Sequence, residues 1–251
     1  MPAKNDFNKE NIDMYLNEFA EECKKLNYNI KPIKIILVGG AAILLNYNFR
    51  KSTDDIDVLN SSFISINEAV KNTAKRLNIT DDWLNDDFKK SPSYSEKIND
   101  VSVLYKNISN ILEIRTINSE YLIAMKLMTD RIDKHDISDI AGVFLEHKRN
   151  NNPLKQKDIE NAVITLYGSL EKLPNDSLML LNNIFNVDNY EKLYIYLENK
   201  EKDARKTLKK LEKNSINDMI FIDNDILKRK VKNIINEKYK DSDDIYFNTE
   251  K

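Results

Sequence analysis

The stretch that decides the fold runs from Leu37 to Val58. Residues 37–42 read Leu-Val-Gly-Gly-Ala-Ala, and residues 50–58 read Arg-Lys-Ser-Thr-Asp-Asp-Ile-Asp-Val. This order predicts an apolar strand, a double glycine, a short helix, and a second strand that begins at Asp55 and Asp57. Because side chains two residues apart on a strand point to the same face, both carboxylates can aim at one point.

This order of elements supplies both parts of a nucleotide site. Gly39 and Gly40 let backbone N–H groups approach a phosphate closely, and the helix N-terminus that follows them favours negative charge. Paired carboxylates are typical ligands of Mg²⁺ in enzymes that use nucleotides. The sequence therefore predicts a phosphate cradle beside a magnesium site at Asp55 and Asp57.

The composition is that of a globular protein with a sizeable core. Hydrophobic residues make up 41% of the chain and charged residues 32%. The net charge of −2 provides no overall basic excess, so any nucleic-acid partner has to be held by local patches. The single cysteine, Cys23, forms no internal disulfide and indicates a reducing compartment. Because the sequence shows no apolar run of membrane length, we expect a cytoplasmic protein without a membrane partner.

Hydrophobic periodicity changes along the chain. Residues 1–150 mix helical and strand patterns, whereas the residues after Pro153 show only helical ones. The predicted strands cover residues 33–38, 56–59, 98–105 and 111–117, and the predicted helices include residues 7–27, 66–78 and 137–147. We therefore predict an α+β fold: a small mixed sheet flanked by helices in residues 1–150, and an all-helical C-terminal subdomain in residues 151–251.

These motifs resemble the nucleotidyltransferase superfamily, which has the polymerase-beta-like fold. Its signature is a strand, Gly-Ser or Gly-Gly, a helix, and Asp-x-Asp on the next strand. The matching segments lie within about residues 33–145 and include residues 82–86, residues 120–127 and Arg131 with residues 136–140. The chain looks most like an uncharacterised bacterial branch, similar to the nucleotidyltransferase toxins of abortive-infection and toxin–antitoxin systems.

The resemblance implies a role for each matching residue. Asp55 and Asp57 bind magnesium, Lys126 contacts the nucleotide phosphates, and Asp136 completes the site. Phosphoryl transfer depends mainly on positioning and charge neutralisation, which metal carboxylates and one cation provide. The implied reaction moves a nucleotide from a nucleoside triphosphate to a hydroxyl of a tRNA or a protein, and a cognate antitoxin is an implied partner.

Several residues have two interpretations at this stage. Arg50 and Thr53 lie between the glycines and the carboxylates, where Arg50 either reaches phosphates or pairs with Asp54. The third acid of the site is either Asp136 or Glu113, but Glu113 also suits an ion pair with Arg115. Asp136 itself competes with Asp130, Asp133 and Asp139. Trp83 either borders the nucleotide or anchors the core.

Two differences from the usual nucleotidyltransferase pattern leave other functions open. Gly40 stands where many relatives carry serine, and a third strand carboxylate is not evident. The alternatives are nucleotidylation of a small molecule such as an antibiotic, and a catalytically inactive module that binds a nucleotide or a partner. The basic runs at residues 200–213 and 228–232 are either solvated helix faces or a grip on RNA.

Overall fold

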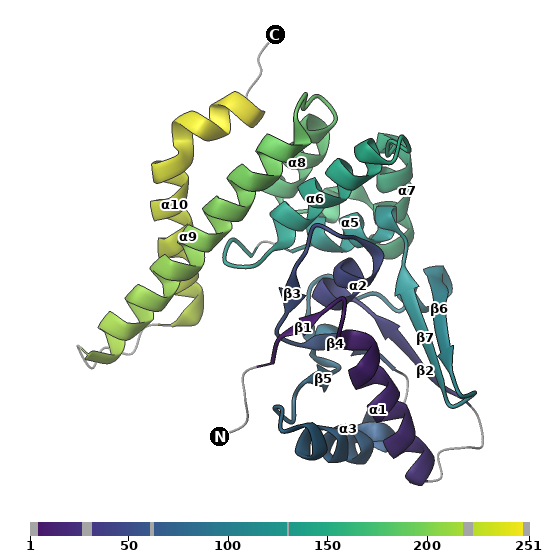
Figure 1. Cartoon of the computed structure of the whole chain (residues 1–251). Coiled ribbons are helices and arrows are strands. Elements are labelled where there is room, and N and C mark those ends of the chain that lie inside the picture. Colours follow the sequence, from purple (N-terminus) through teal and green to yellow (C-terminus); the bar gives the residue numbers. More distant parts are fainter. Residues whose placement is uncertain (1–4, 27–31, 61–62, 130, 218–222, 248–251) are drawn as a thin grey trace. The chain divides into compact units, whose positions relative to one another are not determined.

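A computed structural model of the chain describes residues 5–26, 32–60, 63–129, 131–217 and 223–247 (Figure 1). The α+β class predicted from the sequence is confirmed. The chain divides into two compact units, and neither is continuous in sequence. The first unit comprises Met1–Met125 and Asp158–Ser169, and the second comprises Lys126–Lys157 and Leu170–Lys251. The two units are defined by which residues contact one another, whereas the boundary expected after residue 150 is defined by the change from mixed to purely helical sequence patterns.

The first unit is built on a five-stranded mixed sheet in the order β5-β4-β2-β7-β6. Its strands are β2 (Ile33–Leu37), β4 (Ile56–Leu59), β5 (Leu84–Asn85), β6 (Ser102–Ile108) and β7 (Leu112–Ile117). β2 is antiparallel to β4 and parallel to β7. The central place of β2 explains its nearly continuous apolar sequence, because a strand covered on both faces needs apolar side chains in both directions. Two short strands, β1 (Phe7–Asn8) and β3 (Ser52–Thr53), pair separately.

Helices α1 (Ile12–Lys25) and α3 (Phe63–Leu77) pack together and share a core with one face of the sheet (Figure 1). Trp83 lies in this core with no exposed surface, and its indole N–H donates to the backbone oxygen of Val70 at 3.1 Å. Its ring packs against Phe7, Tyr15 and Phe19. Trp83 is therefore a core anchor, and it is not available to border a nucleotide.

Two element boundaries differ from the prediction. The helix expected over residues 7–27 begins only at Ile12, because the Asn8 side chain accepts from the backbone N–H groups of Glu10 and Asn11 and forms a turn. The strand expected over residues 98–105 begins at Ser102, after the short helix α4 (Ile98–Val101). The chain turns between β6 and β7 at Ser109 and Asn110, which adopt φ of +51° and +57°, the left-handed pair typical of a tight hairpin turn.

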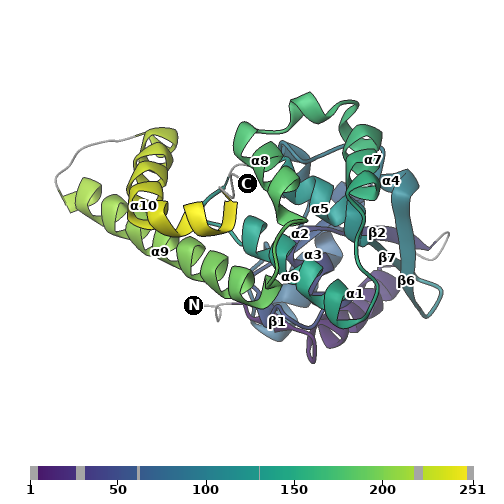
Figure 2. The same ribbon diagram turned by 90° about the horizontal axis from the view of Figure 1, so that it is seen from above.

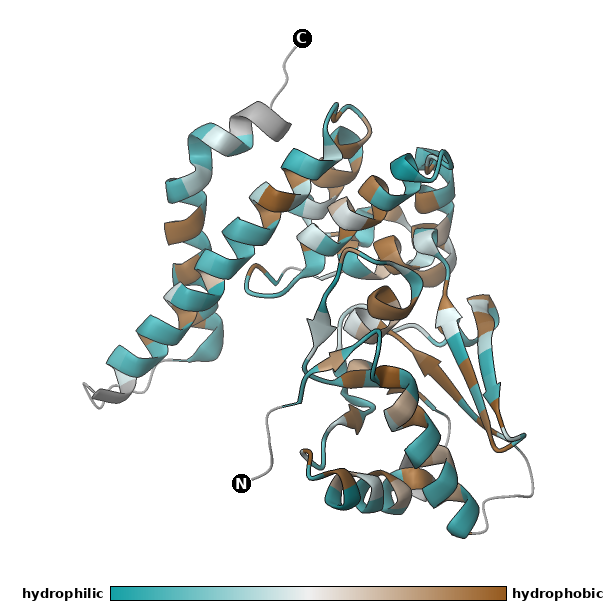
Figure 3. Cartoon of the chain, in the orientation of Figure 1, coloured by the Kyte–Doolittle hydropathy of each residue, from teal (hydrophilic) through white to brown (hydrophobic). Residues whose placement is uncertain are grey.

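The second unit is helical. Its main helices are α6 (Asp136–Arg149), α8 (Asn175–Ile184), α9 (Tyr190–Asn217) and α10 (Asn224–Phe247). α9 and α10 run side by side (Figures 1 and 2) and share a small core of Ala204, Val231 and Ile235. Most residues of these two helices are hydrophilic (Figure 3). Among the residues described here, no helix is long and apolar enough to cross a membrane.

Two further helices, α5 (Ser119–Leu127) and α7 (Gln156–Tyr167), each include residues of both units. Lys126 is the residue of α5 at which the second unit begins. The predicted site residues are therefore divided: Asp55 and Asp57 belong to the first unit, and Lys126 and Asp136 belong to the second.

Candidate active site

Gly39 begins helix α2 (Gly39–Asn46) directly after strand β2. Its φ of +57° is left-handed, and the Oδ2 atom of Asp57 lies 3.2 Å from where a Cβ on Gly39 would stand. The preceding residue, Val38, has no side-chain atom that can accept from the first N–H groups of the helix. A glycine here tolerates the left-handed φ and leaves room for the carboxylate of Asp57. The N–H groups at the helix N-terminus remain suited to a phosphate oxygen.

Gly40 faces the other residues of the predicted cradle. A Cβ on Gly40 would lie 2.7 Å from Thr53 Oγ1 and 2.8 Å from Arg50 Nη2. Arg50 is anchored by its Nε–H, which donates to the backbone oxygen of Ser52 at 3.1 Å. The structure thus brings Gly39, Gly40, Arg50, Thr53 and Asp57 together at one turn. This is the set of residues that the sequence selects for nucleotide and metal binding, apart from Asp55, Lys126 and Asp136.

We expect Gly40→Ala to lower the free energy of unfolding by about 1–3 kcal/mol, because the added methyl group overlaps the buried Thr53 side chain. Gly40→Ser should have the same effect, so a serine does not fit this version of the turn. Urea unfolding of Gly40→Ala, Thr53→Ala and the double variant measures the coupling between the sites. If the double variant loses as much free energy of unfolding as the two single variants together, the proposed overlap is contradicted.

Asp57 lies in β4 and is half-buried, whereas Asp55 is exposed and immediately precedes the strand. The backbone N–H of Val38 donates to the backbone carbonyl oxygen of Asp57 at 3.0 Å, which holds this part of β4 beside the glycine turn. Within the described part of the chain, no three acidic, histidine or cysteine side chains gather as a closed metal site. Two carboxylates still fit Mg²⁺, because this ion commonly takes one or two carboxylates and completes its shell with water and substrate phosphates.

Glu113 is not placed to serve as the third acid. It pairs in register with Lys34, four residues before Val38 along β2. Since Asp57 lies beside Val38, four residues of strand separate Glu113 from Asp57, which is about 13 Å along the sheet. The Glu113 carboxylate instead lies 2.9 Å from Arg115 Nη1. The alternative interpretation of Glu113, as a partner of Arg115, is therefore confirmed.

Lys126 and Asp136 contact each other directly in the second unit. Lys126 Nζ lies 2.7 Å from Asp136 Oδ1 and 2.9 Å from Asp139 Oδ2, and all three side chains are at least nine-tenths buried. Arg131 makes two further bonds to Asp136, at 2.9 and 3.1 Å, and Thr129 Oγ1 donates to it at 2.7 Å. This buried network holds the Lys126 ammonium group in one position.

The charge state of Asp136 follows from this network. Burial raises its pKa, but Lys126 and Arg131 outweigh burial and hold the pKa well below the usual range. A carboxylate held in this way is a weak base, so Asp136 suits the positioning of Lys126 rather than proton abstraction. Of the competing acids, Asp139 shares Lys126, and Asp130 lies outside the described residues.

Glu201 is a buried acid that the sequence reasoning missed. Its Oε1 accepts from the backbone N–H groups of Ile137 at 3.0 Å and Ser138 at 3.1 Å, and its Oε2 bonds the Ser138 hydroxyl. It therefore caps the first turn of α6, which carries Asp136 and Asp139 and has no side-chain cap at its own N-cap residue, His135. No local signal could reveal this role, because Glu201 lies in the basic run of α9 and reaches α6 from a distant part of the sequence.

Glu201 should make stability pH-dependent. Burial, with the nearby charges of Asp139 and Asp136, raises the pKa of Glu201 from 4.5 to about 8. The native state then keeps a proton that the unfolded state releases, so the stability that Glu201 contributes is full below about pH 4.5 and is lost as pH rises through about 8. The slope from this group is at most about 1.4 kcal/mol per pH unit.

Glu201→Gln preserves the hydrogen-bond pattern without the titrating proton. We expect the stability of wild type relative to Glu201→Gln to decrease between pH 5 and pH 8 in urea unfolding series. Glu198→Gln, an exposed change on the same helix, is the control and should follow the wild-type pH dependence. Parallel curves for wild type and Glu201→Gln would show that Glu201 is already ionised in the folded protein.

The fold and the first-unit cluster define a class of protein. A mixed sheet, a glycine turn that opens a helix, and Asp-x-Asp at the next strand are the features of a nucleotidyltransferase core. A family model described as a nucleotidyltransferase of unknown function (DUF6036) matches residues 14–205. The chain belongs to this family. Searches of curated proteins and of solved structures found no match.

Proposed function

We propose that the protein is a magnesium-dependent nucleotidyltransferase that moves a nucleoside monophosphate from a nucleoside triphosphate to an acceptor hydroxyl. The observation that carries the proposal is the convergence of the glycine turn, Arg50, Thr53 and Asp57. Asp55 and Asp57 would hold magnesium, which when bound neutralises triphosphate charge. Membership in a nucleotidyltransferase family supports the same class of reaction.

In the proposed reaction, the acceptor oxygen forms a bond to the α-phosphorus while the bond to pyrophosphate breaks. The N–H groups at the start of α2 and the Arg50 guanidinium bind phosphate oxygens. For Lys126, which belongs to the second unit, the phosphate-contacting role is the one that the resemblance implies. Asp136 and Asp139 orient Lys126, and Glu201 supports the helical turn that carries both. The hydroxyl proton leaves to solvent or to the carboxylates of the first unit, since Asp136 is too weak a base to take it.

One surface feature favours RNA as the acceptor over a protein or a small cationic drug. Four exposed lysines lie at helical spacing along one side of α9 and form a basic stripe: Lys202, Lys206, Lys209 and Lys213. Spacings of four, three and four residues place side chains on the same face of a helix. A row of cations attracts a phosphate backbone without regard to sequence. The resemblance to toxin–antitoxin enzymes makes tRNA the RNA we propose, modified in the bacterial cytoplasm, with an antitoxin as partner.

A label-transfer assay tests the proposed function. The protein is incubated with each α-³²P-labelled nucleoside triphosphate, magnesium, and separate pools of tRNA and protein, with EDTA as the control. We expect label on tRNA in the magnesium reactions and none with EDTA. Label on protein alone would contradict the RNA acceptor while preserving the reaction class. Label on neither pool would favour a module that binds a nucleotide or partner without catalysis.

A further inference from the structure

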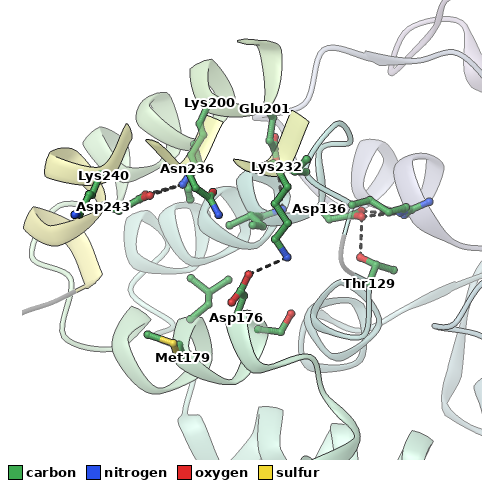
Figure 4. A pocket seen from close by; sticks show the side chains of 16 residues that line it. Thr129, Asp136, Asp176, Met179, Lys200, Glu201, Lys232, Asn236, Lys240 and Asp243 are labelled. Atoms are coloured by element: carbon green, nitrogen blue, oxygen red, sulfur yellow. Dashed lines mark hydrogen bonds and ion pairs between the residues drawn. The ribbon is translucent and has the colours of Figure 1, made fainter. Parts of the chain in front are cut away.

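The second unit contains a pocket that the proposed reaction does not use. Its volume is about 340 Å³, and it lies among the first turn of α6 and helices α8, α9 and α10 (Figure 4). This volume is within the range of small-molecule sites. Apolar side chains form much of its wall: Ile132, Ile137, Met179, Leu180 and Leu197. Met179 is 53% exposed, so an apolar surface remains open to a ligand.

The charged groups of the pocket favour an anionic ligand. Lys200 pairs with Asp243 at 2.6 Å, and Lys232 pairs with Asp176 at 3.0 Å (Figure 4). Lys240 also lines the pocket and has no acidic partner in the part of the chain that the structure describes. The acid Glu201, which also lines it, is mostly uncharged at neutral pH because burial raises its pKa to about 8. Lys240 is therefore a cation of this wall that no acid among the described residues pairs with, and it is available to an anionic group.

One of the ion pairs is easily exchanged. The Asp176 side chain is 63% exposed, whereas the Lys232 side chain is 29% exposed. An ion pair with so much solvent around one partner contributes little stability, typically under about 1 kcal/mol. An incoming anion can therefore take the place of Asp176 on Lys232 at low cost, and Asp176 returns to water.

We propose that this pocket binds a small anionic amphipathic molecule, an organic acid with an apolar or aromatic body. The body lies against Met179, Leu180 and Leu197, and the acid group binds Lys232 and Lys240. Both lysines come from α10 (Asn224–Phe247), which lies beyond the residues matched by the family model. The site is thus built partly from a segment outside that match.

The pocket also borders the network that holds Lys126. Arg131 and Asp136 both line it, and Asp136 is the carboxylate bonded to Lys126. A ligand whose acid group pairs with Arg131 changes the charge around Asp136 and hence around Lys126. This regulatory consequence rests on the proposed function, whereas binding to the pocket does not.

The probe for the test is 8-anilinonaphthalene-1-sulfonate, an anionic aromatic molecule that fluoresces in apolar sites, titrated into the folded full-length protein without nucleotide. Its neutral analogue, N-phenyl-1-naphthylamine, is titrated in parallel. We expect saturable binding at one site per chain for the sulfonate and at least tenfold weaker binding for the neutral analogue. Calorimetry of the same pairs gives the stoichiometry independently of fluorescence.

Variants of α10 locate the site. Lys232→Glu/Lys240→Glu should weaken sulfonate binding at least tenfold. Lys228→Glu/Lys230→Glu, which makes the same charge change at exposed positions of α10 outside the pocket, should leave it within twofold. Circular dichroism and urea unfolding confirm that both variants remain folded. Equal binding of the neutral analogue, equal losses in both variants, or no saturable binding would each overturn the proposal. None of these outcomes depends on whether the protein transfers nucleotides.

Discussion

Asp57→Asn should reduce nucleotidyl transfer on the order of a thousandfold while leaving the protein folded. The amide has nearly the shape of the carboxylate, so it fits beside Gly39 as Asp57 does. It lacks the negative charge that a magnesium ligand supplies, and loss of one well-placed charged group at a phosphoryl-transfer site commonly costs about 3–4 kcal/mol of transition-state stabilisation. The measurement is the initial rate of label transfer at saturating magnesium.

Asp54→Asn is the matched control for this prediction. Asp54 is exposed, carries the same charge and lies three residues away, and it is not among the residues nearest to Gly39 or Gly40. We expect its rate to stay within a few-fold of wild type. Urea unfolding should place both variants within about 1 kcal/mol of wild type. An Asp57→Asn rate within tenfold of wild type would remove this residue from the metal site.

Asp136→Asn should lower the free energy of unfolding by about 3 kcal/mol. Removing one partner of a buried ion pair leaves the other charge uncompensated, and here Lys126 and Arg131 both lose their bonds to the same carboxylate. Lys126 keeps Asp139, which limits the loss to the lower part of the usual 3–5 kcal/mol range. Urea unfolding at neutral pH gives the value.

Asp133→Asn distinguishes Asp136 from its neighbours. Asp133 lies in the same acidic stretch but is less buried than Asp136. We expect a change below about 0.5 kcal/mol, as for most surface substitutions. A single Asp136→Asn variant as stable as wild type would show that the buried network does not support the second unit.

The residues that could be found from the sequence are those whose role follows from local order. Strand β2, the glycines and Asp57 occupy one short stretch, so strand periodicity and the double glycine after the strand were sufficient to predict that they lie together. Strands β6 and β7 were similarly predicted from two alternating segments, although β6 begins later than expected. The helical pattern of the C-terminal residues was also evident from periodicity.

Other features depend on packing between distant segments. Glu201 looked like one acid in a basic run, and only the approach of α9 to α6 shows that it caps the turn of Asp136. Lys126 was selected by resemblance, but its pairing with Asp136 and Asp139 depends on how the end of α5 lies against the first turn of α6. The pocket of the second unit draws on four separate segments, so no single stretch of sequence could indicate it.

The central claim is that the protein transfers a nucleotide and not a phosphoryl group. The most direct measurement compares α-³²P-labelled and γ-³²P-labelled forms of the same nucleoside triphosphate, with magnesium and the tRNA pool. The account predicts that α-label enters the acceptor, that γ-label appears only in pyrophosphate, and that Asp57→Asn abolishes both signals. Label in the acceptor from the γ-position, or α-label transfer that survives Asp57→Asn, would contradict it.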